Sequence, residues 1–171
     1  LLLPIQKGEN MSKTSHLKTF LYFIAFILIV EGIGALSSLF AGDIKSIYNN
    51  LKLPPLAPPD YLFGIVWPLL YALIAISGFL IFRLLGTYKT EARLALTYFV
   101  LQLFINFIWS IIFFKGYYWS GVITILLLDL IVFICLIKFL KLDKVSGICL
   151  IPYLIWILFA TYLSIGVALL N

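Results

Sequence analysis

Polar and aromatic side chains recur along one face of the apolar segment 94–114. They are Gln102, Asn106, Trp109, Ser110 and Phe113. Steps of three and four residues place such side chains on the same side of an α-helix. A carboxamide is costly to expose to lipid, so both amides must face a neighbouring helix or a cavity. Two interpretations stay open: hydrogen bonding between helices, and a ligand wall, which the tryptophan on this face favours.

Two further apolar segments carry a comparable face. In segment 61–82 the face consists of Gly64, Trp67, Tyr71, Ala75 and Gly78. In segment 145–170 it consists of Pro152, Trp156, Ala160, Leu163 and Val167. Large rings beside small residues suit a flat apolar ligand held between helices. The alternative for both tryptophans is an aromatic belt at the membrane–water interface.

Two carboxylates, Glu31 and Asp129, also lie inside apolar segments. Each is either a protonated acid hydrogen-bonded to a neighbour or a functional contact to a proton or ligand. The sequence contains no HExxH, GxSxG, Walker or CxxCH motif. Its single histidine, His16, precedes the first apolar segment, so a bis-histidine haem site within one chain is excluded. We therefore predict no catalytic residues, no metal site and no required cofactor.

The elements that must position these residues follow from the composition. The chain is 64% hydrophobic and 11% charged, whereas soluble domains carry about 25% charged residues. Five apolar runs are each long enough to cross a hydrocarbon core about 30 Å thick. They span residues 19–41, 61–82, 94–114, 117–137 and 145–170. We predict an all-α, five-helix transmembrane bundle forming one domain over residues 11–171. Residues 1–10 precede Met11 and are expected to be a non-native or disordered extension.

Basic residues predict the orientation of the bundle. Of twelve Lys and Arg residues, nine fall on the side of the N-terminus and of the connections after the second and fourth runs. The positive-inside rule then puts the N-terminus in the cytoplasm and the C-terminus outside a cell membrane. The net charge of +5 thus reflects membrane orientation rather than nucleic-acid binding. Four prolines, Pro54, Pro55, Pro58 and Pro59, predict that the outer loop 42–60 is semi-rigid and extended over one end of the bundle.

Three motifs, in chain order, resemble the TspO/MBR family of translocator and tryptophan-rich sensory proteins. The first runs from Tyr48-Asn-Asn-Leu-Lys-Leu-Pro54-Pro through Pro58-Pro59 to Phe63, Trp67 and Tyr71. The second is Gln102-x3-Asn106-x2-Trp109-Ser110-x2-Phe113-Phe114. The third is Pro152-x3-Trp156-x2-Phe159-Ala160-x2-Leu163, with Asn171 at the end. The resemblance covers residues 31–171.

The resemblance implies a five-helix bundle, usually a homodimer, that binds porphyrins such as protoporphyrin IX under its first loop. A sensory or regulatory role in tetrapyrrole handling is the function it favours. Position by position, it implies a ligand site between the helices, to which the polar face described above adds Gln102. The residues of this site are Tyr48, Pro54, Pro58, Trp67, Tyr71, Gln102, Asn106, Trp109, Trp156, Ala160 and Leu163. We expect Tyr48 on the inner side of a proline lid and Tyr71 at the floor.

Several positions depart from the family pattern. Ile47 stands where relatives commonly have tryptophan, which weakens the alternative of light-dependent porphyrin degradation. Ser164 replaces a common asparagine, and no basic residue follows Tyr162, so sterol transport is not carried over. A loose sterol-recognition pattern at Leu85, Tyr88 and Arg93 runs through a polar connection and is discounted. A transporter of tetrapyrroles or lipids remains a further alternative, although inverted repeats are not evident.

Overall fold

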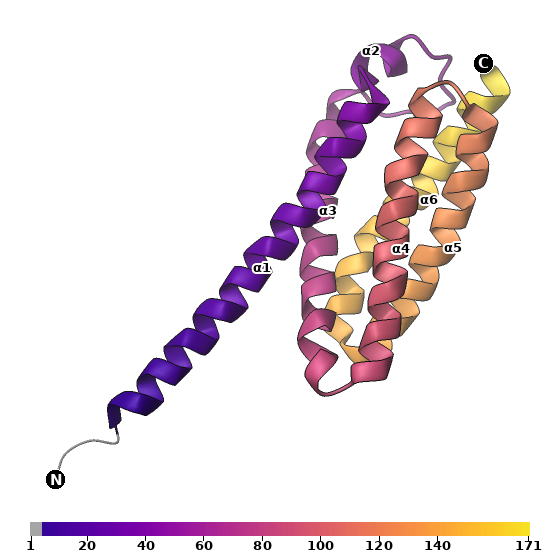
Figure 1. The fold of residues 1–171 in the computed structure, drawn as a ribbon. Coiled ribbons are helices and arrows are strands. Elements are labelled where there is room, and N and C mark those ends of the chain that lie inside the picture. Colours follow the sequence, from indigo (N-terminus) through magenta and orange to yellow (C-terminus); the bar gives the residue numbers. More distant parts are fainter. Residues whose placement is uncertain (1–4) are drawn as a thin grey trace.

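The computed structural model describes residues 5–171, with side chains from His16 onward. Five long helices make up most of the described chain (Figure 1). They are α1 (Ile5–Ala41), α3 (Tyr61–Phe82), α4 (Lys89–Phe114), α5 (Tyr118–Leu142) and α6 (Lys144–Leu170). A short helix, α2 (Ile44–Asn49), follows α1, and a 3-10 turn, η1 (Arg83–Gly86), follows α3.

The long helices form a closed ring in the order α1, α3, α6, α5, α4. The connections η1, Lys115–Tyr117 and Asp143 are short, so α3, α4, α5 and α6 alternate in direction along the bundle. Figure 1 shows that the N-terminal half of α1 leaves this bundle and projects away from it. The C-terminal half of α1 packs against α3 and α4.

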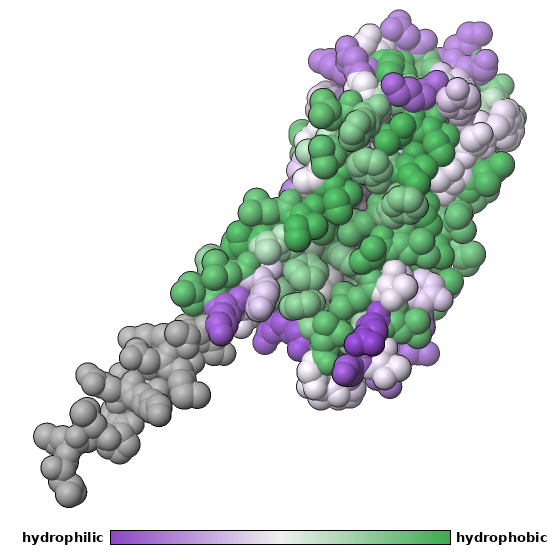
Figure 2. All heavy atoms as spheres, viewed as in Figure 1, coloured by the Kyte–Doolittle hydropathy of each residue, from purple (hydrophilic) through white to green (hydrophobic). Residues whose placement is uncertain are grey.

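The exposed side chains indicate that lipid surrounds the long helices. Large apolar side chains are exposed along every long helix, among them Leu28, Leu69, Phe104, Ile123 and Ile155. On the face drawn in Figure 2, hydrophobic residues form a continuous middle zone, and hydrophilic residues gather near the ends of the bundle. Among the described residues, five helices are long and apolar enough to span a membrane. The predicted all-α fold with five membrane-spanning helices is therefore confirmed.

Close packing and polar contacts hold the helices together. The hydroxyl of Ser77 on α3 donates to the carbonyl of Ser146 on α6 at 2.7 Å, and the Ser146 hydroxyl donates back to the Ser77 carbonyl at 2.8 Å. Gly78 lets the Phe99 ring of α4 lie directly against α3, since a Cβ there would overlap that ring. In a bilayer, where apolar burial gives helices little net attraction, such close approaches and interhelical hydrogen bonds decide association.

The element bounds differ from the predicted runs where charged residues extend a helix. The second run matches α3, but α4 begins at Lys89 rather than residue 94, and α5 continues to Leu142 rather than residue 137. Hydropathy finds only the lipid-facing part of a helix, while the polar turns at its ends keep their backbone hydrogen bonds in water. The first run lies within the longer helix α1, and residues 1–4 lie outside the described part of the chain.

The prediction that loop 42–60 is extended throughout is wrong for its first third, which forms α2. The Asp43 carboxylate accepts a hydrogen bond from the Ser46 backbone N–H at 3.1 Å and so caps this helix. All four loop prolines come later, from Pro54 onward, so none interrupts α2. The loop does cover one end of the bundle (Figure 1).

The proline-containing part of the loop is fixed to the C-terminal end of α6. Asn171 and Lys52 exchange two hydrogen bonds of 3.0 Å between the amide side chain and the Lys52 backbone. The Tyr162 hydroxyl donates to the Pro55 carbonyl at 2.6 Å. Gly166 leaves room for the Pro54 ring, which a Cβ would overlap. These contacts give the loop a defined position over the ends of the helices.

Candidate functional site

A cavity of about 550 Å³ lies between α1, α3 and α4, beneath α2. Its size is that of a pocket for a small organic molecule. Side chains from these four helices, together with residues at the ends of the loop, surround it. The lining residues are Glu31, Gly34, Ala35, Ser38, Gly42, Asp43, Ile44, Lys45, Tyr48, Asp60, Tyr61, Phe63, Gly64, Trp67, Pro68, Tyr71, Trp109, Ser110 and Phe114.

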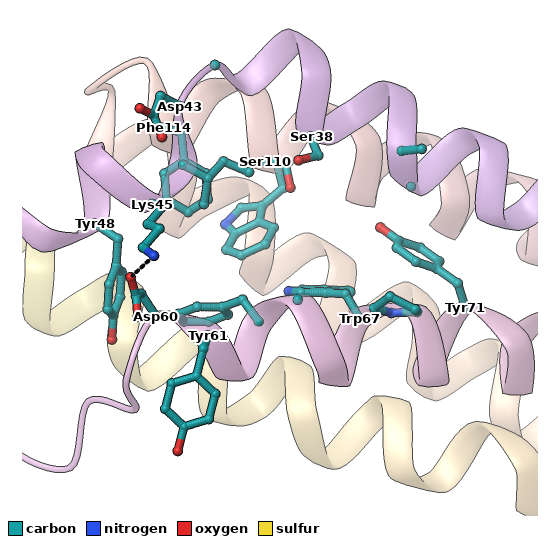
Figure 3. A pocket seen from close by; sticks show the side chains of 18 of the residues that line it. Ser38, Asp43, Lys45, Tyr48, Asp60, Tyr61, Trp67, Tyr71, Ser110 and Phe114 are labelled. Atoms are coloured by element: carbon teal, nitrogen blue, oxygen red, sulfur yellow. Dashed lines mark ion pairs between the residues drawn. The ribbon is translucent and has the colours of Figure 1, made fainter.

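Three aromatic rings build one wall of the cavity. The Trp67 ring stacks on Tyr71 one turn along α3, with 5.5 Å between centroids, and lies 6.3 Å from the Trp109 ring of α4. Trp109 in turn stacks on Phe113 at 5.8 Å. Figure 3 shows Trp67 and Tyr71 on α3 facing α1 across the cavity. Rings fixed in this way offer a flat, weakly polar surface on which a planar ligand can stack.

The opposite wall is a face of α1 made of small and polar residues. Glu31, Gly34, Ala35 and Ser38 recur at helical spacing and all line the cavity. Gly34 is buried directly against Tyr71, and a Cβ at this position would overlap three atoms of the tyrosine ring. The absence of a side chain at Gly34 therefore sets how closely α1 approaches the aromatic wall. Glu31 places a carboxyl group within the cavity at membrane depth.

A buried hydrogen-bond network continues from the aromatic wall into the bundle. The Tyr71 hydroxyl donates to Asn106 Oδ1 at 3.3 Å, and Asn106 Nδ2 donates to the Tyr153 hydroxyl at 2.8 Å. The Tyr153 hydroxyl donates to Gln102 Oε1 at 3.0 Å. These bonds connect α3, α4 and α6. The two amides thus serve the interhelical role that was one of their two predicted interpretations, and they reach the cavity only through Tyr71.

One polar group on the cavity wall has no partner. The indole N–H of Trp109 is buried and has no acceptor among the described residues, and the whole side chain is only 6% exposed. A buried N–H without an acceptor costs about 1–3 kcal/mol. A ligand that presents an acceptor atom to this N–H would remove that cost, so Trp109 can contribute both a stacking surface and a directional hydrogen bond.

The mouth of the cavity is closed by α2 and the start of α3. The Tyr48 hydroxyl donates to the Pro58 carbonyl at 2.7 Å, and its ring meets Phe63 edge-on at 4.9 Å. Asp60 accepts a hydrogen bond from Asn49 at 3.0 Å and pairs with Lys45 at 3.6 Å, the ion pair drawn in Figure 3. These contacts make α2 and the loop after it a lid.

The electrostatics of the lid follow from these contacts. The hydrogen bond from Asn49, followed by the charge of Lys45, lowers the pKa of Asp60 below its ordinary value, so the carboxylate is ionised at neutral pH. Burial, and then the negative charge of Asp60, raises the pKa of Tyr48, which keeps its hydroxyl protonated as a donor. The lid is thus in its fully bonded form at neutral pH.

The site residues implied by the motifs fall into three groups in space. Tyr48, Trp67, Tyr71 and Trp109 line the cavity. Asn106 and Gln102 lie behind it in the hydrogen-bond network. The remaining five, Pro54, Pro58, Trp156, Ala160 and Leu163, do not line this cavity; they belong to the loop and to α6.

Trp156 is separated from the cavity by Phe63, with 6.2 Å between the two ring centroids. Conversely, α1 supplies lining residues that the motifs do not include. The signal for them was present in the sequence, because Glu31, Gly34, Ala35 and Ser38 form one helical face around a carboxylate in an apolar segment.

Comparison with known proteins agrees with this architecture. Residues 25–170 match the sequence profile of the TspO/MBR family. The chain belongs to the TspO/MBR family. The match runs from Ala25 in α1 to the end of α6, and so includes residues of every helix that contributes to the cavity.

Relatives of this family occur in distant organisms. The chain is 37% identical over 153 residues to tryptophan-rich protein TspO of Archaeoglobus fulgidus, covering 88% of this chain and 97% of the relative. It is 31% identical over 150 residues to protein CrtK of Rhodobacter capsulatus, covering 87% and 92%. It is 27% identical over 144 residues to the translocator protein of Ovis aries, covering 82% and 85%. This TspO/MBR chain is thus a multi-pass membrane protein similar to relatives over most of their length.

Proposed function

We propose that this protein binds a porphyrin, such as protoporphyrin IX, or a similar flat apolar molecule in the cavity beneath α2. The observation that carries the proposal is the aromatic wall of Trp67, Tyr71 and Trp109 beside a cavity of about 550 Å³. A macrocycle stacked on these rings would be desolvated on one face.

The unpartnered Trp109 N–H adds an orientation requirement. A ligand carrying ring or carboxylate acceptors meets this requirement, whereas a pure hydrocarbon does not. Ser38 and Ser110, which also line the cavity, supply hydroxyl groups that can donate or accept. The site therefore favours a large planar molecule with a few polar atoms. Such recognition fits a sensory or regulatory role in tetrapyrrole handling, exerted from a homodimer in the cell membrane with the N-terminus in the cytoplasm.

Titration of protoporphyrin IX against the detergent-purified protein, followed by the porphyrin absorbance band, tests the proposal. Trp109→Phe keeps a ring but removes the N–H, and we expect it to weaken binding about 3- to 10-fold, the value of one hydrogen bond. The matched control is Trp119→Phe on α5, which is exposed, lies outside the cavity and should leave the affinity unchanged.

Non-saturable absorbance changes, or equal affinities in the two variants, would show that the porphyrin partitions into detergent or binds elsewhere. Repeating the titration in light and in darkness separates binding from degradation. If porphyrin extracted from the illuminated sample shows its original absorbance band, the protein binds it without changing it. If the band is lost in light and kept in darkness, the porphyrin has been degraded, which is the enzymatic alternative.

A further inference from the structure

A second hollow lies on the membrane-facing surface, toward the end of α4 that is opposite to the ligand cavity. It is a groove of about 770 Å³ along the outer face of α4, and it includes Leu85 of η1. Its lining residues are Leu85, Lys89, Arg93, Leu96, Thr97, Val100, Leu101 and Phe104. None of these residues lines the cavity beneath α2. The groove is therefore a separate feature that the proposed porphyrin site does not use.

The groove is polar at one end and apolar along the rest. Lys89 and Arg93 are one helical turn apart on α4, at the end of the bundle where α4 begins. Both are exposed, and neither forms an ion pair or side-chain hydrogen bond with any described residue. Val100 and Phe104 follow further along α4 and are 63% and 59% exposed. The two basic side chains at one end of the groove thus adjoin an apolar stretch that runs along the rest of it.

The length of this apolar stretch matches one leaflet of a bilayer. From Arg93 to Phe104 the helix advances about 16 Å at 1.5 Å per residue. Half of a hydrocarbon core is about 15 Å. A lipid with its headgroup beside Arg93 would accordingly have its acyl chain alongside Phe104. The cations lie at the start of a membrane-spanning helix, which is the level of the lipid headgroups.

An adjoining groove offers room for a second acyl chain. This groove, about 620 Å³ in volume, lies between α1 and α4 and shares Leu96, Val100 and Phe104 with the first. Its other lining residues are all apolar: Phe26, Ile29, Val30, Ile33, Phe82, Phe99, Leu103 and Phe107. Together the two grooves have one basic end and two apolar branches. These features match the charged headgroup and the two acyl chains of an anionic phospholipid.

We propose that these grooves bind an anionic phospholipid, with its phosphate between Lys89 and Arg93 and its acyl chains along α4 and between α1 and α4. Charge complementarity selects this occupant, because two unpaired cations favour an anionic headgroup over a zwitterionic one. The lipid would fill the gap beside α1, the helix whose N-terminal half leaves the bundle (Figure 1). Lipid composition would thereby control how tightly α1 closes against α4.

The test is native mass spectrometry of the full-length protein titrated with phosphatidylglycerol and with phosphatidylcholine of the same acyl chains. We expect at least tenfold preference for phosphatidylglycerol. Two basic side chains near an anionic headgroup together change affinity about 30-fold. Lys89→Gln combined with Arg93→Gln should therefore remove the preference.

The matched control is Lys141→Gln combined with Lys144→Gln, which removes the same charge at the same end of the bundle, outside both grooves. It should change the preference less than threefold. For the acyl part, Val100→Trp fills the groove and should weaken retention of both lipids. Ile123→Trp on the exposed face of α5 should not. Circular dichroism during melting confirms that each variant is folded.

Four outcomes would overturn the proposal. Equal binding of the two lipids would show that Lys89 and Arg93 do not discriminate between the headgroups. If the two double variants lose the preference for phosphatidylglycerol to the same extent, the preference comes from the overall positive charge at this end of the bundle and not from Lys89 and Arg93. Displacement of phosphatidylglycerol by a sterol would assign the groove to sterol. A dimer that excludes lipid where the monomer binds it would assign the surface to a second copy of the chain.

Discussion

Substitution of Gly34 by alanine tests whether the contact between α1 and Tyr71 shapes the cavity. The added Cβ would overlap the Tyr71 ring. That ring has little freedom to move, because Trp67 stacks on it at 5.5 Å and its hydroxyl is bonded to Asn106. We expect the ring to be displaced, with loss of this hydrogen bond and a smaller cavity.

The magnitude follows from three contributions. Overpacking a close contact costs about 1–3 kcal/mol, and loss of one buried hydrogen bond costs about 1 kcal/mol. The change from glycine to alanine inside a helix returns about 1 kcal/mol. The net expectation is a loss of about 2 kcal/mol in the free energy of unfolding, together with weaker porphyrin binding.

Gly32→Ala is the control on the same helix, since nothing lies within 4 Å of a Cβ at Gly32. This variant should gain up to about 1 kcal/mol from helix propensity alone. The two alanine variants should therefore differ by about 3 kcal/mol when unfolding by denaturing detergent is followed by circular dichroism.

A double-mutant cycle with Tyr71→Ala isolates the contact. If Gly34→Ala costs as much in the Tyr71→Ala background as in the native protein, the loss does not arise from the tyrosine ring. Equal stability of the Gly34 and Gly32 variants would refute the reasoning outright, because it would mean that α1 moves away from α3 without cost.

Three further outcomes are expected. Because the pKa of Asp60 is lowered in the folded state, its contacts with Asn49 and Lys45 stabilise the lid at pH values above the ordinary carboxyl pKa of about 4, and this stabilisation is lost as pH falls through the lowered value. The protection factors of the α2 amides, corrected for the pH dependence of intrinsic exchange, should therefore fall below about pH 4 in the native protein, and Asp60→Asn should reduce this fall. Gly166→Ala should displace the Pro54 ring and increase proteolysis near the exposed Leu56, while Gly32→Ala should not. Tyr153→Phe should leave Asn106 Nδ2 and Gln102 Oε1 without their partner and cost about 1–3 kcal/mol in thermal or detergent unfolding, whereas Tyr162→Phe at the surface should cost less.

The number and type of long helices could be predicted from the sequence because the solvent leaves few choices. An apolar run long enough to cross the hydrocarbon core must satisfy its backbone polar groups internally, and a helix does so. The α2 helix could not be found this way, since it lies outside the apolar runs and depends on one local cap at Asp43. The same reason explains why the polar first turn of α4 was assigned to a connection.

The aromatic wall could also be predicted, but the neighbours of each face could not. Helical spacing placed Trp109 and Asn106 on one face, and both do point inward, yet only Trp109 lines the cavity because it is one turn nearer to α2. Trp156 satisfied the same spacing on α6, but Phe63 of α3 occupies the space between it and the cavity. Spacing fixes which side of a helix a residue occupies. The crossing of α1 over α3, permitted by Gly34, determines which of those sides encloses a space.

That dependence on α1 connects the two sites on this protein. The cavity wall opposite Trp67 and Tyr71 is the α1 face from Glu31 to Ser38, and the apolar groove beside α4 is bounded by Val30 and Ile33 of the same helix. A rigid shift of α1 toward α4 would narrow the groove and change the cavity together, because one segment of α1 borders both: Glu31, Gly34 and Ala35 line the cavity, and Val30 and Ile33 line the groove. A ligand in the cavity and a lipid in the groove must therefore influence each other's affinity whenever they favour different positions of α1. By thermodynamic linkage, each changes the affinity of the other by the same factor. Porphyrin titration in phosphatidylglycerol and in phosphatidylcholine nanodiscs measures this coupling, and an identical affinity in the two would show that α1 keeps one position in both.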